Sequence, residues 1–257
     1  MTLTLDAFSL KGKVAIVTGA GARPNSIGEA YAKGLAAAGA QVAVADLDGA
    51  GAARVAALIG PQAIGLGVDI TDPASAQAMV AAVKAKFGGV DILVNNAALM
   101  VEVGRTPMIA TAIDHWNKVM AVNVTGALNC AQAVVGSMRE RGGGKIINQA
   151  SAGAFPAGGV YGITKLAIVG LTTALAKELG PDNIQVNCIA PGMTKSEAGL
   201  SLTPDDSPLV RLVGMLAPKP RGEPDDLVGP LLMLCSRAGD WMTGQTLNVD
   251  GGWVMRS

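Results

Sequence analysis

Histidine is almost absent from this sequence, and cysteine is rare. The chain of 257 residues holds one histidine and three cysteines. Cys130, Cys188 and Cys235 lie far apart, and none belongs to a CxxC pair. We therefore predict neither a disulfide framework nor a zinc site, and we interpret the cysteines as small buried residues of a reducing compartment. His115, next to Trp116, is interpreted as structural.

An excess of charge of either sign is also missing. Lysine plus arginine is 20 and aspartate plus glutamate is 20, so the formal net charge is zero. Nucleic-acid-binding proteins usually carry a basic patch, and anionic membrane surfaces attract polybasic segments. The zero net charge therefore argues against nucleic acids and membranes as binding partners. Hydrophobic residues make up 50% of the chain, which is too many for a disordered protein.

The sequence has no long uninterrupted apolar run. The longest, residues 227–235, is broken by Gly229 and Pro230 and is far shorter than the ~20 residues of a membrane span. Residues 1–6 lack the basic and apolar regions of a signal peptide. We therefore expect a cytoplasmic protein. Its length favours one large domain, residues 1–257, over two small ones.

Short apolar runs alternate with longer alanine-rich stretches. The runs, predicted to be strands, cover residues 14–17, 42–45, 64–68, 92–94, 146–147, 184–189 and 246–249. The predicted helices cover about 27–38, 49–58, 73–87, 111–141, 161–179 and 224–236. Continuous apolar strands suit a parallel sheet, and the alternation gives right-handed βαβ units. We predict an α/β fold, a Rossmann-like doubly wound parallel sheet with helices on both faces and a ligand at the carboxyl ends of the strands.

A glycine-rich turn follows the first predicted strand. Residues 18–28 read Thr-Gly-Ala-Gly-Ala-Arg-Pro-Asn-Ser-Ile-Gly and lead into the helix that begins near Ile27. Glycine lets the backbone approach a pyrophosphate, and the helix N-terminus offers N–H groups and the positive end of a dipole. Asn25 or Ser26 is the candidate cap of that helix. A turn placed between strand and helix in this way predicts a dinucleotide-binding loop.

Acidic residues end the second and third predicted strands. Asp46 follows the glycine loop at close to the ~20-residue offset of the acid that binds the adenosine ribose. A carboxylate there repels a 2′-phosphate and favours NAD over NADP. Arg23 is the opposing signal, because a basic residue in the glycine loop can contact a 2′-phosphate. Asp69 is a candidate for the adenine amino group, and Asp72 or Thr71 caps the next helix.

Two residues with acid–base chemistry lie one helical turn apart. Tyr161 and Lys165 share one face of a predicted helix. A free tyrosine has a pKa near 10, and a nearby ammonium lowers it. The pair is therefore a candidate acid–base device for an alcohol or a ketone.

Further polar residues follow other predicted strands. Ser151 follows residues 145–149, Asn95 opens the Asn-Asn-Ala-Ala motif after the fourth strand, and Asn123 lies in the next helix. Together with Tyr161 and Lys165, these residues make the sequence resemble the short-chain dehydrogenase/reductase family. The resemblance extends over essentially the whole chain, from residues 11–14 to 249–252.

The resemblance implies a role for each matching residue. Tyr161 is implied to be the general acid/base, and Lys165 to bind the nicotinamide ribose and lower the pKa of Tyr161. Ser151 is implied to polarise the substrate oxygen, and Asn123 to hold a water that links the lysine to solvent. The implied contacts of the cofactor, NAD, are Gly19, Ser26, Ile27, Gly28, Asp46, Leu47, Asp69, Ile70, Asn95, Ala97, Tyr161, Lys165, Ile189, Pro191, Gly192 and Thr194.

The sequence departs from the family pattern in three places. The glycine loop is about three residues longer than TGxxxGxG, with Ser26 at the middle glycine position, so Gly21, Ala22 and Arg23 receive no pyrophosphate contact. The motif after the fourth strand ends in alanine where glycine is commoner. Ser151 precedes Tyr161 by ten residues instead of about thirteen, and Asn148 is the poorer alternative to Ser151.

Residues 193–220 are irregular and are expected to form a substrate lid. Residues 203–206 read as a helix start, and the helix that follows carries the apolar residues Leu209, Val210, Leu212, Val213, Met215 and Leu216. An apolar lid favours an apolar substrate, although these residues equally suit packing onto the domain. Arg211 and Arg105 are interpreted as solvated charges rather than as contacts for a substrate carboxylate.

Two predicted helices are apolar almost all round, at residues 121–135 and 166–176. One face of each covers the sheet, and the other needs a partner. We predict a subunit interface there, and the resemblance implies a dimer or a tetramer.

The leading hypothesis is an NAD-dependent oxidoreductase that interconverts a secondary alcohol and a ketone on an apolar or cyclic small molecule. The alternative is an NADPH-dependent reductase of carrier-bound 3-oxoacyl chains, which Arg23 favours and Asp46 opposes. A third hypothesis is a non-catalytic sensor of NAD(H), against which the complete serine, tyrosine, lysine and asparagine set argues.

Overall fold

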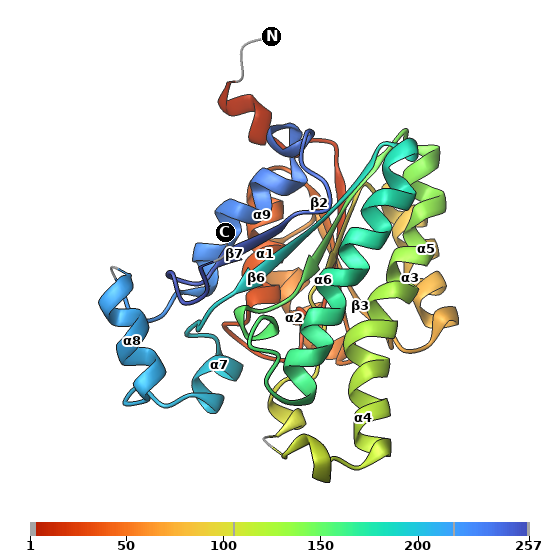
Figure 1. Cartoon of the computed structure of the whole chain (residues 1–257). Helices are drawn as coiled ribbons and strands as arrows, with labels where there is room; N and C mark the ends of the chain where they lie inside the picture. Colours follow the sequence, from red (N-terminus) through yellow and green to blue (C-terminus); the bar gives the residue numbers. More distant parts are fainter. Residues whose placement is uncertain (1–3, 105, 218, 256–257) are drawn as a thin grey trace.

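Seven parallel strands form one sheet in a computed structural model that describes residues 4–104, 106–217 and 219–255 (Figure 1). Their order is β3-β2-β1-β4-β5-β6-β7. The strands are β1 (Val14–Thr18), β2 (Gln41–Asp46), β3 (Ala63–Gly67), β4 (Ile92–Asn95), β5 (Gly144–Gln149), β6 (Ile184–Pro191) and β7 (Thr246–Val249). The order reverses beside β1, where β2 lies on one side and β4 on the other. A doubly wound sheet binds its ligand at such a switch point.

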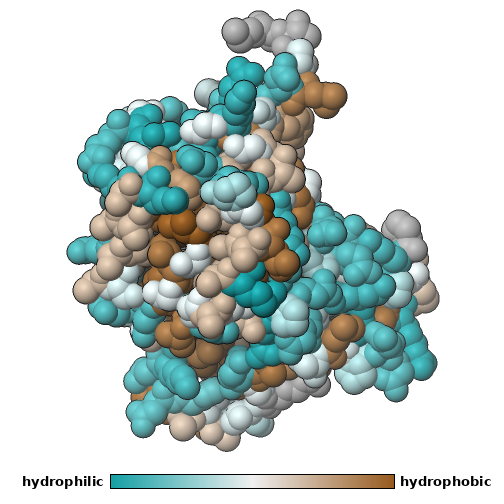
Figure 2. Space-filling model, turned by 180° about the vertical axis from the view of Figure 1, so that it is seen from behind, coloured by the Kyte–Doolittle hydropathy of each residue, from teal (hydrophilic) through white to brown (hydrophobic). Residues whose placement is uncertain are grey.

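Helices cover both faces of the sheet, each over its own apolar core. The first face carries α1 (Ile27–Ala37), α2 (Gly49–Ile59) and α9 (Val228–Cys235). The second carries α3 (Pro73–Phe87), α5 (Gly126–Glu140) and α6 (Gly159–Leu179). Seen from behind the view of Figure 1, apolar residues gather in the middle of the molecule, and hydrophilic residues cover much of the side nearer residues 193–220 (Figure 2). The predicted fold class is confirmed.

The prediction of one regular helix over residues 111–141 is wrong. The chain forms α4 (Ile113–Met120), a π-helical stretch over Ala121–Thr125, and then α5. π-Helical turns recur at functional sites, and this one contains Asn123. The 3-10 helices are η1 (Leu5–Phe8), η2 (Val101–Val103), η3 (Met108–Ala110), η5 (Ala152–Ala154), η6 (Gly180–Asp182), η7 (Pro224–Leu227) and η8 (Arg237–Gly239).

Capping side chains fix the starts of the helices near the carboxyl ends of the strands. Ser26 caps α1 by accepting a hydrogen bond from the backbone N–H of Glu29 at 3.1 Å. Asp72, and not Thr71, caps α3 through the N–H of Ala74 at 2.9 Å. These caps place each helix N-terminus directly after its strand.

Two helical stretches, Ile113–Glu140 and Gly159–Asp182, are long and apolar enough to cross a membrane by length and composition. Neither stretch contains a long uninterrupted apolar run. Both pack against the sheet and contribute core residues such as Val134 and Leu175. We therefore assign them as core helices of a globular fold.

Residues 193–220 leave the sheet after β6 and form α7 (Glu197–Leu202) and α8 (Pro208–Leu216). The base of this segment is closed, because Thr194 forms a parallel bridge with Gly222 and the N–H of Lys195 donates to the carbonyl of Gly222 at 2.8 Å. A Cβ on Gly251 would contact Val213, so α8 packs against the C-terminal turn.

Candidate active site

The glycine turn after β1 is a close-packed cradle. Gly19 has a φ of 68°, and a Cβ there would collide with Ala97. A Cβ on Gly28 would collide with the carbonyl oxygen of Gly19. Only glycine fits both positions, and the N-terminus of α1, which opens with Ile27, lies beside them. These residues fit a pyrophosphate, as the sequence predicts.

Asn96 shapes the cradle, and the sequence analysis gave it no role of its own. Its Nδ2 donates to the carbonyl oxygens of Thr18 and Gly19, both at 2.8 Å. The side chain of Asn95 instead turns into the core, where its Nδ2 donates to Oδ1 of Asn148 at 2.9 Å. The resemblance implies a cofactor contact through the backbone of Asn95, and the inward turn of its side chain leaves that backbone role unchanged. Asn148, fully buried, is excluded as an alternative to Ser151.

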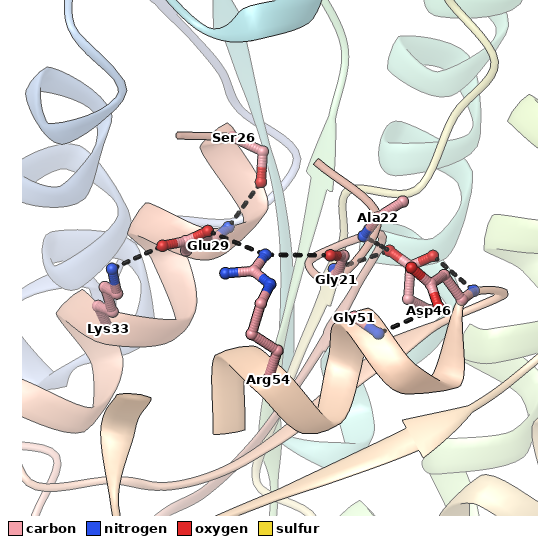
Figure 3. A network of polar contacts seen from close by, with 9 residues as sticks. Gly21, Ala22, Ser26, Glu29, Lys33, Asp46, Gly51 and Arg54 are labelled. Atoms are coloured by element: carbon pink, nitrogen blue, oxygen red, sulfur yellow. Dashed lines mark hydrogen bonds and ion pairs between the residues drawn. The ribbon is translucent and has the colours of Figure 1, made fainter. Parts of the chain in front are cut away.

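The carboxylate of Asp46 is held by the glycine loop (Figure 3). Its Oδ2 accepts hydrogen bonds from the N–H groups of Gly21 at 2.8 Å and Ala22 at 3.1 Å. Its Oδ1 accepts one from the N–H of Asp48 at 3.0 Å. A carboxylate has about four acceptor sites, so one remains on Oδ1 for a ribose hydroxyl. Leu47, next in the chain, is 77% exposed.

The lengthened loop is also held from the side of α1 and α2. Arg54 donates from Nη2 to the carbonyl of Gly21 at 3.3 Å and lies 3.6 Å from Oε2 of Glu29 (Figure 3). Lys33 pairs with the other oxygen of Glu29 at 2.6 Å. A Cβ on Gly21 would collide with the backbone of Ala52, so the loop packs directly on α2. The extra residues of the glycine loop are therefore an ordered part of the site.

The predicted adenine contacts lie after β3. Oδ1 of Asp69 accepts hydrogen bonds from the hydroxyl of Thr71 at 2.7 Å and from its N–H at 2.8 Å, and these bonds lower the pKa of Asp69. Ile70 is buried, and its side chain packs where a Cβ of Gly126 would lie. Asp69 is thus an exposed carboxylate beside a buried apolar wall.

The hydroxyl groups of Tyr161 and Ser151 lie near each other at the carboxyl end of β5, where Ser151 affects the pKa of Tyr161. Burial raises the pKa of Tyr161 to about 12, and the hydrogen bond from Ser151 lowers it in part. The Nζ atom of Lys165 lies 5.7 Å from the ring centroid of Tyr161 and donates to the carbonyl of Gln149 at 2.8 Å. The expected lowering of the Tyr161 pKa by Lys165 is not found, since burial raises this pKa and Ser151 alone lowers it. Burial instead lowers the pKa of Lys165 to about 8.

The short spacing between Ser151 and Tyr161 is accommodated by a tight turn. Ser151 caps η5, where its Oγ accepts the N–H of Gly153 at 3.1 Å. Ala157 and Gly159 then adopt positive φ angles of 50° and 67° and bring the chain back toward Ser151. Ten residues therefore suffice to join the two hydroxyl groups.

The side chain of Asn123 is fully engaged. Its Oδ1 accepts the N–H of Leu99 at 2.7 Å, while its Nδ2 donates to the carbonyl of Leu99 at 3.0 Å and to Oγ1 of Thr164 at 3.1 Å. The side chain thus fixes the loop after β4 to α6. The predicted water contact of Asn123 is left to its backbone.

The predicted nicotinamide contacts follow β6. Pro191 ends that strand, and the N–H of Gly192 donates to the carbonyl of Val249 at 3.0 Å. A Cβ on Gly192 would collide with Asp250. Thr194 is buried, with its Oγ1 3.1 Å from Oγ of Ser196.

A cavity of about 310 Å³ lies beside Tyr161. It is lined by Val103, Gly104, Thr106, Pro107, Met108, Thr111, His115, Gly158, Gly159, Val160 and Tyr161. The Nε2 atom of His115 lies 3.0 Å from the carbonyl of Val103, so this histidine both holds the loop and lines the cavity. Interpreting it as purely structural was therefore incomplete.

The helix expected to cover the site does not line this cavity. The outer side of α8 is exposed, including Met215 at 76%, and Arg211 is exposed as well. An apolar lid over the site was the reason to expect an apolar substrate, and the position of α8 does not support that inference. Arg105 lies outside the described residues.

The sequence matches a family model described as "Enoyl-(Acyl carrier protein) reductase" over residues 21–254. An uncharacterized oxidoreductase of Mycobacterium tuberculosis is 45% identical over 249 residues, which cover 95% of this chain and 98% of that protein. The chain belongs to the short-chain dehydrogenase/reductase family.

Two further members of this family have named activities. A sorbitol dehydrogenase of Cereibacter sphaeroides is 38% identical, with 95% of this chain and 99% of that protein covered. A solved structure of 7α-hydroxysteroid dehydrogenase, complexed with NADH and 7-oxo glycochenodeoxycholic acid, superposes with a TM-score of 0.87 at 34% identity, covering 99% of both chains. This short-chain dehydrogenase/reductase is thus an oxidoreductase that acts on CH–OH groups or the matching ketones.

Proposed function

We propose that this protein is an NAD-dependent oxidoreductase that interconverts a secondary alcohol and a ketone on a small molecule. The observation that carries the proposal is the position of Tyr161 at the wall of a cavity, with the hydroxyl of Ser151 near its own and Lys165 beside its ring. Bound NAD would supply the hydride acceptor for oxidation of the alcohol, and NADH would supply the hydride donor for reduction of the ketone.

The chain's own residues supply the proton chemistry. The raised pKa of Tyr161 keeps its phenol protonated at neutral pH, so that it can give its proton to a ketone oxygen. In the opposite direction the phenolate takes the proton of the alcohol, and the ammonium of Lys165 stabilises that negative charge. Ser151 holds the same substrate oxygen by a hydrogen bond.

The preference for NAD over NADP rests on two side chains. Asp46 presents its negative charge where a 2′-phosphate would lie, and its exposed fraction is only 8%. Arg23, the residue that favours NADP, is bound by Glu102 and Glu197, each at 2.9 Å. A guanidinium that already has two carboxylate partners is a poor ligand for a further phosphate.

The cavity beside Tyr161 indicates a small substrate with an apolar or cyclic body. Its volume of about 310 Å³ is near the lower end for small-molecule sites. Val103 and Val160 supply apolar wall, whereas Thr106, Thr111 and His115 offer hydrogen-bonding groups for further polar atoms.

Titration of the purified protein with NADH and with NADPH, followed by nucleotide fluorescence, tests the cofactor assignment. Much tighter NADH binding supports it, and cyclic secondary alcohols are then the first substrates to assay with NAD. Tighter NADPH binding overturns it and favours the alternative, a reductase of carrier-bound 3-oxoacyl chains. That alternative rests on Arg23 in the glycine loop, and Asp46 opposes it.

The variant Tyr161→Phe separates an enzyme from a sensor of NAD(H). An enzyme loses nearly all turnover and keeps its affinity for NADH. A sensor would respond to NADH as the unaltered protein does, and that outcome would overturn the catalytic proposal.

We also propose a cytoplasmic homo-oligomer, a dimer or a tetramer, built through the outer faces of α4, α5 and α6. Ile113 on α4 is 70% exposed and Leu166 on α6 is 45% exposed. Light scattering after size exclusion gives the mass directly. A monomer at micromolar concentration would overturn this assembly, and Leu166→Lys should dissociate it if it forms.

A further inference from the structure

Arg23, in the lengthened glycine loop, is bound to two carboxylates from distant parts of the chain. Its Nη1 donates to Oε1 of Glu197 at 2.9 Å, and its Nη2 donates to Oε1 of Glu102 at 2.9 Å. Glu197 is the first residue of α7, and Glu102 lies in η2, in the loop after β4. One guanidinium therefore joins three segments that follow three different strands.

A second contact joins the same loop to residues 193–220. Asn25, with a φ of 50°, donates from Nδ2 to the carbonyl of Lys195 at 3.1 Å. In addition, α7 lies against η2. The extra residues of the glycine loop thus reach across to the segment after β6 at two points.

The same segment is fixed at its base and at its bend. The bridge between Thr194 and Gly222 closes the base. The buried Arg221 donates from Nε to Oδ1 of Asp205 at 2.8 Å and from Nη2 to the carbonyl of Thr203. With these points fixed, the pair of Arg23 and Glu197 sets how closely the α7 end lies to the glycine loop.

The position of these contacts matters for a dinucleotide. A molecule that extends from Asp46 to Tyr161 along the carboxyl ends of the strands passes between the glycine loop and the segment after β6, which carries Thr194. Arg23 joins the two sides of that path. To open the path on the side of α7, the ion pair of Arg23 with Glu197 and the hydrogen bond of Asn25 to Lys195 have to separate, while Glu102 holds Arg23 on the other side.

We propose that Arg23, Glu102 and Glu197 form a clasp that closes residues 193–220 over the bound cofactor and slows its release. The clasp rests on the proposed function, NAD binding at this site. Arg23 is here a positioning residue, because it acts on the cofactor through the two loops that it joins. The three side chains are between about one-third and one-half exposed, so dissolved salt should weaken the clasp.

Release of NADH from the full-length protein tests the clasp. NADH is mixed with the protein and displaced by excess NAD in a stopped-flow fluorimeter, at salt concentrations from about 0.05 to 0.5 M. In the unaltered protein the release rate should rise several-fold with salt. Arg23→Met should release NADH about five-fold faster at low salt, as expected for two half-exposed ion pairs, with little further effect of salt.

A matched control and a rescue separate the clasp from general loosening. Lys195 pairs with Glu223 at 2.7 Å in the same region with similar exposure, and Lys195→Met should leave both the rate and its salt dependence unchanged. Glu197→Gln should accelerate release in the same direction as Arg23→Met. The reversed pair, Arg23→Glu with Glu197→Arg and Glu102→Gln, should restore slow, salt-sensitive release.

Two results would contradict the clasp, and they can be told apart. If Arg23→Met and Glu197→Gln release NADH at the rate and with the salt dependence of the unaltered protein, the clasp is wrong and NAD binding stands. If the unaltered protein binds no NADH, the proposed function fails and the clasp fails with it.

Discussion

The N–H of Gly21 donates to the Asp46 carboxylate at 2.8 Å, so the glycine loop and the acid proposed to bind the ribose are one hydrogen-bonded unit. The unit has a cost for cofactor binding, because three hydrogen bonds from the protein leave Asp46 one acceptor site for a ribose hydroxyl. It also has a benefit, since the loop is ordered before the cofactor arrives.

Asp46→Ala is expected to disorganise the loop and to weaken NADH binding. Two loop N–H groups lose their acceptor, which typically costs about 1–3 kcal/mol, so the Kd for NADH should rise roughly tenfold or more. The Kd for NADPH should rise less, because the repulsion of the 2′-phosphate is removed. Fluorescence titration of both nucleotides measures the ratio, with Asp69→Asn as the control. An unchanged ratio would show that Asp46 does not select the cofactor.

Releasing Arg23 from its carboxylate partners should shift cofactor preference. In the variant Glu102→Gln with Glu197→Gln, the guanidinium becomes available to a 2′-phosphate one residue from the loop N–H groups that bind Asp46. We expect NADPH to bind about five-fold more tightly relative to NADH, the size of a partly exposed ion pair. Glu223→Gln removes a carboxylate from the same region and should leave the relative affinity as it was. No shift in the double variant would mean that Arg23 cannot reach the phosphate.

The raised pKa of Tyr161 predicts opposite pH profiles for the two directions. Because burial brings this pKa to about 12, the phenol stays protonated at neutral pH and ketone reduction should be nearly flat from pH 6 to 9. Alcohol oxidation needs the phenolate, so kcat/KM should rise with pH over the same range. Initial rates in both directions give the profiles. An oxidation rate that falls as pH rises would contradict the role of Tyr161.

Ser151→Ala should move the oxidation profile toward higher pH. The hydrogen bond from Ser151 lowers the pKa of Tyr161, so its removal leaves the phenolate harder to form. We expect kcat to fall by about 10²-fold or more. The affinity for NADH should not change. A loss of rate without any displacement of the profile would confine Ser151 to substrate positioning.

Lys165→Met should abolish turnover and stabilise the fold at neutral pH. The folded-state pKa of Lys165, about 8, lies below that of an unfolded lysine, so burying the ammonium costs the full penalty below pH 8. The shift corresponds to about 3 kcal/mol, offset in part by the hydrogen bond to Gln149. As pH rises from 8 toward the unfolded value, the penalty disappears. Urea unfolding measures the difference in stability between Lys165→Met and the unaltered protein, and this difference should be smaller at pH 10 than at pH 7. A difference that is the same at both pH values would contradict the buried charge.

The sequence predicted the parts of the site that depend on chain order. Strand ends in a parallel sheet meet at one edge, so Asp46, Ser151 and Pro191 could be placed there from the alternation of strands and helices. Tyr161 and Lys165 followed from helical spacing. The family resemblance, confirmed by the comparisons, supplied their proposed roles.

Contacts between loops could not be predicted in the same way. Nothing in the local sequence says that Arg23 pairs with Glu102 and Glu197, since those partners are brought near by the fold. The engagement of the Asn123 amide by Leu99 and the inward turn of Asn95 depend on packing around a π-helical stretch. The course of α8 was missed because an apolar helix face can pack on any apolar neighbour.

The contact between Gly19 and Ala97 links two motifs that are far apart in the chain. A Cβ on Gly19 would overlap the Cα of Ala97, so position 19 has no room for a side chain. Any side chain there must push the glycine turn away from Ala97. In evolutionary terms the two positions form one inherited unit, and exchange of either motif between relatives should succeed only when both are transferred together.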